Sequence, residues 1–111
     1  MPELTPQEFE EKKYADYFSQ LETAYKRAFD KLNERYDSEL IHAIDQQILN
    51  ESEPVYEGDG KFRVKIPDNP EDRIEGVIVD DAKLESVLEK YVSEIEQQLR
   101  IVFDFEEEPK A

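Results

Sequence analysis

The stretch TPQEFEEKKYADYFSQLETAYKRAFDKLNERY, residues 5–36, decides how this chain folds. Its apolar and aromatic side chains recur at steps of three and four, which is the period of an α-helix and not of a β-strand. The stripe consists of Tyr14, Phe18, Leu21, Tyr25, Phe29, Leu32 and Tyr36. Thr5 is placed as the N-cap, Pro6 at the first helical position, and Glu8 to complete a capping box. The pattern predicts one long amphipathic helix over residues 5–36.

A straight helix of this length is too long for a chain of this size. It would extend about 48 Å at roughly 1.5 Å per residue, whereas a compact chain of this length has a radius of gyration near ~13 Å. The helix must therefore bend or fray, or project so that another chain covers its outer side chains. The stripe then either faces the chain's own core or forms part of a homodimer interface. For the interface we name Tyr14, Tyr17, Phe18 and Tyr25.

The remaining patterns predict an α+β domain. After Tyr36 the apolar stripe changes phase, which indicates a kink or break near Asp37 and a second helix to about Leu49. Residues 55–57, 61–66 and 74–79 have strand patterns, and the first two flank a Gly-Asp-Gly hairpin turn at 58–60. Asp80 caps a last helix. The order α-α-β-β-β-α predicts a single domain over residues 1–105, with its helices on one face of a three-stranded antiparallel meander. We expect residues 106–111 to be an acidic, mobile tail.

The chain is strongly acidic, with 29 Asp and Glu against 14 Lys and Arg and a net charge of −15. Such a field repels nucleic acid and anionic membrane, so we expect neither as a partner. The start of the chain has no signal-peptide pattern and no stretch has the length of a membrane span, which predicts a cytoplasmic protein. Three interpretations of the charge remain open: adaptation to concentrated salt, mimicry of a polyanion that captures a basic partner, or an incidental property.

One strip of positive charge stands out on the predicted middle strand. Lys61, Arg63 and Lys65 alternate with apolar residues and therefore share one face. The strip could receive a phosphate or carboxylate group as a weak anion contact. Glu57 and Glu75 lie on the strands predicted to flank it, and cross-strand pairing with them explains the strip without a ligand.

Signals for catalysis or metal binding are sparse. Glu39 and His42 have the Glu-x-x-His spacing of di-iron helical bundles, but the chain has a single His, so only a dimer could complete such a site. The sequence contains no Cys and only three Gly, too few for a phosphate-binding loop. We predict no cofactor and no enzymatic activity.

Residues 36–60, YDSELIHAIDQQILNESEPVYEGDG, followed by KFRV at 61–64, resemble a family of short acidic haloarchaeal proteins with no assigned function. The likeness extends to YVSEIEQQLR at residues 91–100. It implies no activity and no site residue, but it favours the salt-adapted interpretation of the charge.

The sequence thus predicts a non-catalytic protein that acts through protein–protein contacts. It is predicted to form a homodimer through the outer aromatic residues of the first helix. One alternative is an acidic adaptor or polyanion mimic that binds a basic protein and releases it as salt rises. The other is a metal-dependent enzyme that uses Glu39 and His42.

Overall fold

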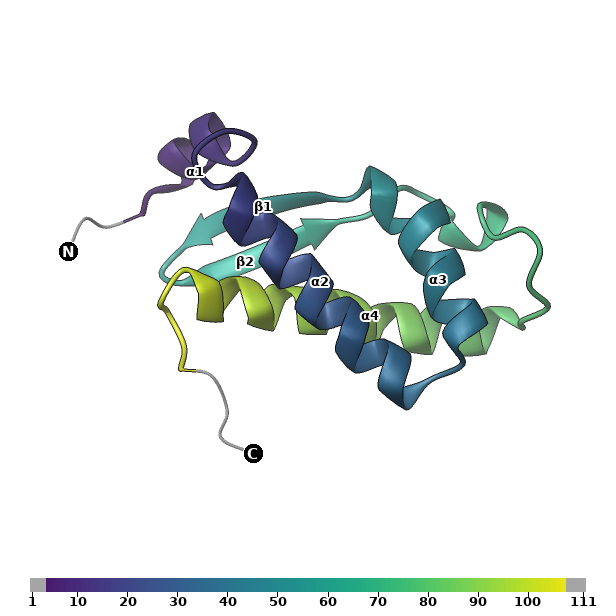
Figure 1. Cartoon of the computed structure of the whole chain (residues 1–111). Coiled ribbons are helices and arrows are strands. Elements are labelled where there is room, and N and C mark those ends of the chain that lie inside the picture. The colour runs from purple at the N-terminus through teal and green to yellow at the C-terminus, as the bar shows by residue number, and fades with distance from the viewer. Residues whose placement is uncertain (1–3, 108–111) are drawn as a thin grey trace.

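The computed structural model describes residues 4–107, and this part of the chain contains α-helices, a β-hairpin and two 3₁₀ turns (Figure 1). In chain order the elements are α1 (Pro6–Lys12), α2 (Phe18–Arg35), α3 (Ser38–Gln47), η1 (Leu49–Glu51), β1 (Glu53–Gly58), β2 (Lys61–Lys65), η2 (Pro70–Asp72) and α4 (Asp81–Val102). The α+β class predicted from the sequence is confirmed. The three-stranded sheet and the unbroken first helix are wrong, for reasons given below.

The predicted N-terminal helix is broken between Lys13 and Tyr17. Thr5 does cap α1, and its Oγ1 accepts a hydrogen bond from the N–H of Glu8 at 3.1 Å. The chain then turns, and the N–H of Tyr17 donates to the carbonyl of Lys12 at 3.0 Å before α2 begins. The turn lets α1 pack against β1 (Figure 1). An unbroken helix of about 48 Å would have equalled the whole 47 Å long axis of the molecule.

The boundary predicted near Asp37 is confirmed. α2 ends at Arg35, and Tyr36 takes an extended conformation with φ −129° and ψ 172°. Asp37 is the N-cap of α3, and its Oδ1 accepts a hydrogen bond from the N–H of Glu39 at 3.1 Å. The caps of α2 and α3 therefore divide the two apolar stripes between two helices of different direction.

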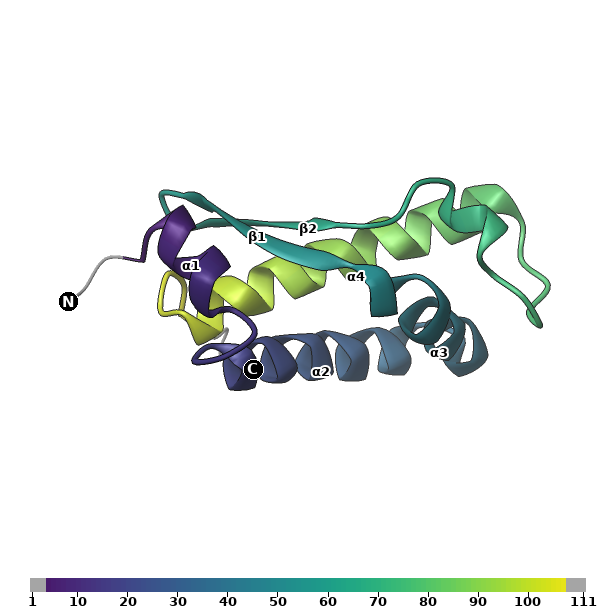
Figure 2. The same ribbon diagram turned by 90° about the horizontal axis from the view of Figure 1, so that it is seen from above.

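β1 and β2 form an antiparallel hairpin, as predicted for these two strands. Asp59 and Gly60 both have positive φ, 53° and 74°, which is the requirement of a type I′ turn. The buried face of the hairpin consists of Pro54, Tyr56, Phe62 and Val64. α1 packs against β1 and α4 packs against β2, while the alternate residues of β2 stay exposed (Figure 2).

The predicted third strand over residues 74–79 does not form, and the sheet has two strands within the described chain. After β2 the chain leaves the hairpin through η2 and returns as an extended loop toward α3 (Figure 1). There the side-chain amide of Gln47 binds the backbone of Glu75: Oε1 accepts from its N–H at 2.7 Å, and Nε2 donates to its carbonyl at 3.0 Å. A side chain thus satisfies backbone groups that a neighbouring strand would otherwise pair.

α4 is the central packing element, because it contacts both β2 and α2 (Figure 2). Asp80 caps it as predicted, with Oδ1 accepting from the N–H of Lys83 at 2.7 Å. Tyr91, Ile95 and Leu99 of its apolar stripe are completely buried. The buried side chains of α4 thus line the core from the hairpin near one end of the helix to α3 near the other.

Beyond α4, Glu106 is held against the helix. Its carboxylate accepts hydrogen bonds from Nε2 of Gln97 at 2.9 Å and from Nε of Arg100 at 3.0 Å, and these contacts lower the pKa of Glu106. Of the tail predicted to be mobile, residues 108–111 lie outside the described residues.

Candidate interaction surfaces

An apolar groove of about 190 Å³ lies where the turn before α2 faces the start of β1. Its apolar lining consists of Tyr14, Phe18, Leu21, Tyr25, Leu49 and Pro54. Glu22 and Ser52 are the polar members. We call this surface the aromatic groove. Three of the four aromatic residues that the sequence named for an interface lie in it.

The exposure of the aromatic groove follows from the broken helix. Tyr14 lies in the turn and is 60% exposed, and Phe18 opens α2 and is 47% exposed. Deeper along the same side of α2, Leu21 is buried. Tyr25 forms a hydrogen bond between its hydroxyl and Oγ of Ser52 at 2.9 Å, and burial raises the pKa of Tyr25 to about 12. The groove therefore has a fixed floor and two exposed rings at its rim.

Tyr17, the fourth residue named for the interface, lies away from the groove. Its ring stacks on Phe9 at 6.4 Å and meets Phe103 edge-on at 5.3 Å. Its hydroxyl donates to Glu8 at 2.7 Å, a hydrogen bond that raises the pKa of Tyr17. Tyr17 thus joins the aromatic cluster that packs α1 on the end of α4.

Lys13 lies next to the aromatic groove and contacts residues on two of its sides, and no sequence pattern predicted this role. Its Nζ donates to the carbonyl of Pro54 at 3.0 Å and forms ion pairs with Glu10 at 2.8 Å and Glu53 at 3.3 Å. It also lies 5.3 Å from the ring centre of Tyr14. Burial opposes the charged form, but the hydrogen bonds and charges of Glu10 and Glu53 outweigh it and raise the pKa of Lys13.

The positive strip lies on the exposed face of β2, as its alternation predicted. Arg63 pairs with Glu57 across the hairpin at 3.1 Å, and Lys65 stands opposite Glu53 in the register. The expected pairing with Glu75 is wrong, because Glu75 lies in the loop bound by Gln47 and not on a neighbouring strand. Cross-strand pairing with Glu57 therefore explains the charge of Arg63 at this position without a ligand.

Glu39 and His42 both lie on the exposed side of α3. Nδ1 of His42 is 2.8 Å from the carbonyl oxygen of Ser38, and its ring meets Phe29 edge-on with 4.9 Å between centres. Within residues 4–107 no three His, Asp or Glu side chains gather as a possible metal site. The two residues alone supply too few ligands, so a metal here would still require a second copy.

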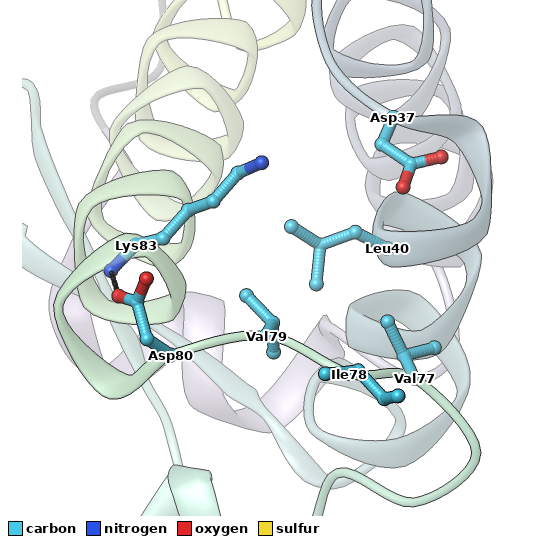
Figure 3. Close-up of a pocket in the computed structure, with 7 residues that line it drawn as sticks. All are labelled: Asp37, Leu40, Val77, Ile78, Val79, Asp80 and Lys83. Carbon is cyan, nitrogen blue, oxygen red and sulfur yellow. Dashed lines mark hydrogen bonds between the residues drawn. The ribbon is translucent and has the colours of Figure 1, made fainter.

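A second hollow, of about 380 Å³, lies between the start of α3, the loop before α4 and the first turn of α4. Asp37 and Leu40 line it from α3, Val77, Ile78 and Val79 from the loop, and Asp80 and Lys83 from α4 (Figure 3). Sequence reasoning missed this hollow because it assigned residues 74–79 to the sheet. The signal available in the sequence was the strand-like pattern of residues 74–79, a segment that has no strand partner in the described structure.

These features define a small acidic α+β protein. The chain belongs to DUF5783, a family of unknown function, which it matches over residues 1–106. Neither curated proteins nor solved structures yield a match. The predicted membership of a family without an assigned function is confirmed. The predicted haloarchaeal, salt-adapted character of that family stays a prediction. No helix within residues 4–107 is both long enough and apolar enough to cross a membrane.

Proposed function

We propose that this protein is a non-catalytic interaction protein that self-associates through the aromatic groove. The observation that carries the proposal is the pair of exposed rings, Tyr14 at 60% and Phe18 at 47%, on the rim of an apolar groove. Exposed apolar surface of this kind marks contact sites in soluble proteins. In a two-fold dimer each copy presents the same patch, so the rings of one copy enter the groove of the other.

The charge distribution favours a second copy as the occupant. The aromatic groove has one charged lining residue, Glu22, in a chain whose residues are 39% charged. Two molecules of net charge −15 repel each other, and the repulsion is weakest where the facing surfaces carry the fewest charges. Burial of the two rings stabilises the dimer by about 25 cal/mol for each Å² of apolar surface removed from water.

Salt determines whether this contact forms. At roughly 0.1 M ionic strength charges interact over about 10 Å, and at 1 M over about 3 Å. Concentrated salt screens the repulsion between the copies while leaving apolar burial intact. We therefore include in the proposal that the charge of −15 is an adaptation to high salt.

Light scattering on a sizing column tests the proposal, at roughly 0.1 M and then at multimolar KCl. We expect a dimer at high salt that loosens at low salt. Phe18→Ser removes one ring from the rim and should give a monomer at both salt concentrations. Ile78→Ser is the matched control, because Ile78 is fully exposed but lies outside the groove. A wild-type monomer at both salt concentrations, or a dimer unchanged by Phe18→Ser, contradicts the proposal.

A further inference from the structure

The backbone of residues 77–79 is extended and unpaired. Within the described chain, no hydrogen bond reaches the peptide groups of these three residues. The segment is fixed at both ends, by the bond between Gln47 and Glu75 on one side and by the Asp80 cap of α4 on the other. An extended backbone held open in this way is a template for pairing with another strand.

The hairpin shows that this fold protects its other strand edges. On the edge of β1, Nζ of Lys13 donates to the carbonyl of Pro54 at 3.0 Å, and Pro54 has no N–H to offer. On the edge of β2, the N–H of Val64 donates to a carboxylate oxygen of Glu96 at 3.0 Å. Charged side chains at an edge block pairing with a foreign strand. Nothing within residues 4–107 covers the backbone of residues 77–79 in an equivalent way.

Side chains around this segment form a binding surface for one apolar group. Ile78 is 105% exposed, which is complete exposure. Beside it, Leu40 and Val79 point into the hollow of about 380 Å³, with Asp37 and Lys83 on its opposite walls (Figure 3). An apolar side chain of a bound strand would meet the floor of this hollow, and a polar neighbour would meet its rim.

Charge identifies the kind of strand that fits. Asp37, Glu75, Asp80 and Asp81 are all exposed around the segment, against one lysine, Lys83. A second copy would bring the same carboxylates to this surface and be repelled. A strand with Lys or Arg beside its apolar residue would be attracted.

We propose that residues 77–79 bind an extended segment of a partner protein by strand pairing, and that the segment carries an apolar residue flanked by Lys or Arg. Its apolar side chain occupies the hollow, and its cations pair with Asp37 and Asp80. This surface is separate from the aromatic groove, so the proposal does not depend on self-association.

The test is an amide NMR titration at roughly 0.1 M KCl, where screening is weak. The probe is a short capped peptide of alternating lysine and valine. We expect shifts confined to residues 74–83 and to the start of α3. Methylation of the peptide's backbone nitrogens keeps its charge but blocks strand pairing, and it should weaken binding roughly tenfold. Ile78→Ser should also weaken binding, whereas Phe18→Ser should leave it unchanged.

Several results would overturn this inference. Shifts spread over the acidic surface, with equal affinity for the methylated peptide, would indicate attraction by net charge alone. Equal binding of an aspartate–valine peptide would remove the charge argument. Shifts at residues 74–83 that develop with protein concentration, without peptide, would identify a second copy as the occupant. Ile78→Ser is the control in the self-association test and the test variant here, whereas Phe18→Ser is the reverse. Failure of strand pairing is therefore distinguishable from failure of self-association.

Discussion

At the scale of single residues, Lys13 joins two elements of the fold, α1 and β1. Its side chain is buried, and its Nζ contacts α1 through Glu10 and β1 through Glu53 and the carbonyl of Pro54. The two carboxylates are half exposed, with side-chain accessibilities of 49% and 47%. Loss of the lysine would leave one buried carbonyl without its donor and two carboxylates that water can still reach.

We predict that Lys13→Met lowers the unfolding free energy by about 1–3 kcal/mol, the cost of an unsatisfied buried polar group. The larger loss of about 3–5 kcal/mol, typical of a broken fully buried ion pair, is not expected because Glu10 and Glu53 remain hydrated. Urea denaturation measures the change. Lys12→Met, at the neighbouring position, is the control and should change stability by less than about 0.5 kcal/mol. Equal losses in both variants would contradict the assigned role of Lys13.

Two tyrosines, Tyr25 and Tyr91, contribute to a dependence of stability on alkaline pH. The raised pKa values of Tyr17 and Lys13 act in the same direction. Burial raises the pKa of Tyr25 to about 12, and burial together with Asp45 raises the pKa of Tyr91. A raised folded pKa favours the protonated form, so the stabilisation is complete below the unfolded pKa of about 10 and is lost as pH rises through the folded pKa. We predict a falling unfolding free energy from pH about 10 to about 12.

Urea denaturation at stepped pH measures this dependence, with tyrosinate absorbance recorded alongside. Tyr25→Phe removes one of the groups whose pKa is raised in the folded state, and it should make the loss shallower. Tyr14→Phe is the matched control, because Tyr14 is 60% exposed, and it should reproduce the wild-type slope. An alkaline slope that Tyr25→Phe leaves unchanged would show that Tyr25 is not linked to unfolding.

At the scale of elements, the sequence predicted those boundaries that carry a local chemical signal. Thr5 and Asp80 each accept the capping hydrogen bond expected of them, and at the predicted break Asp37 accepts the bond that caps α3. The hairpin turn was also predictable, since Asp59 and Gly60 suit positive φ. The break between Lys13 and Tyr17 has neither Gly nor Pro, and next to it Lys13 contacts the carbonyl of Pro54, 41 residues further along the chain. Helical periodicity cannot report such a contact.

The missing strand illustrates the same limit. Residues 74–79 are rich in β-branched side chains, which favour extended backbone, but the chain bends at Gly76, where φ is 82°. A strand also requires a partner, and here the amide of Gln47 takes that place. The strand predicted for this segment was therefore wrong, and its location beside α3 could not be predicted from residue type. The hollow at this position escaped prediction for the same reason.

The aromatic groove was predicted only in its composition. The periodic stripe identified Tyr14, Phe18 and Tyr25, which the structure places together. The opposite wall, Leu49 and Pro54, comes from segments that follow α3, and no pattern in the sequence relates them to the first helix. Tyr17, which the sequence named for the interface although it is not part of the stripe, packs instead against Phe9 and Phe103.

At the scale of the whole molecule, charge and shape act against each other. The net charge of −15 is confined to a body with extents of 47 × 33 × 21 Å, so most charges lie within a few Debye lengths of one another at low salt. Such self-repulsion destabilises a compact state more than an expanded one. The ion pairs of Lys13, Lys31, Arg63 and Arg100 are local and relieve only part of it.

We therefore predict that the unfolding free energy of the monomer rises with KCl, on the order of 1 kcal/mol between about 0.1 and 1 M, equivalent to a Tm increase of several degrees. Phe18→Ser provides a suitable background, since it removes the contact proposed for self-association. On this background, Glu34→Gln, Glu85→Gln and Glu89→Gln together reduce the net charge from −15 to −12 at exposed positions. This variant should be more stable at low salt and gain less from KCl. Equal salt slopes in both proteins would show that KCl acts through something other than self-repulsion, and the salt-adapted interpretation of the charge would then lose its physical basis.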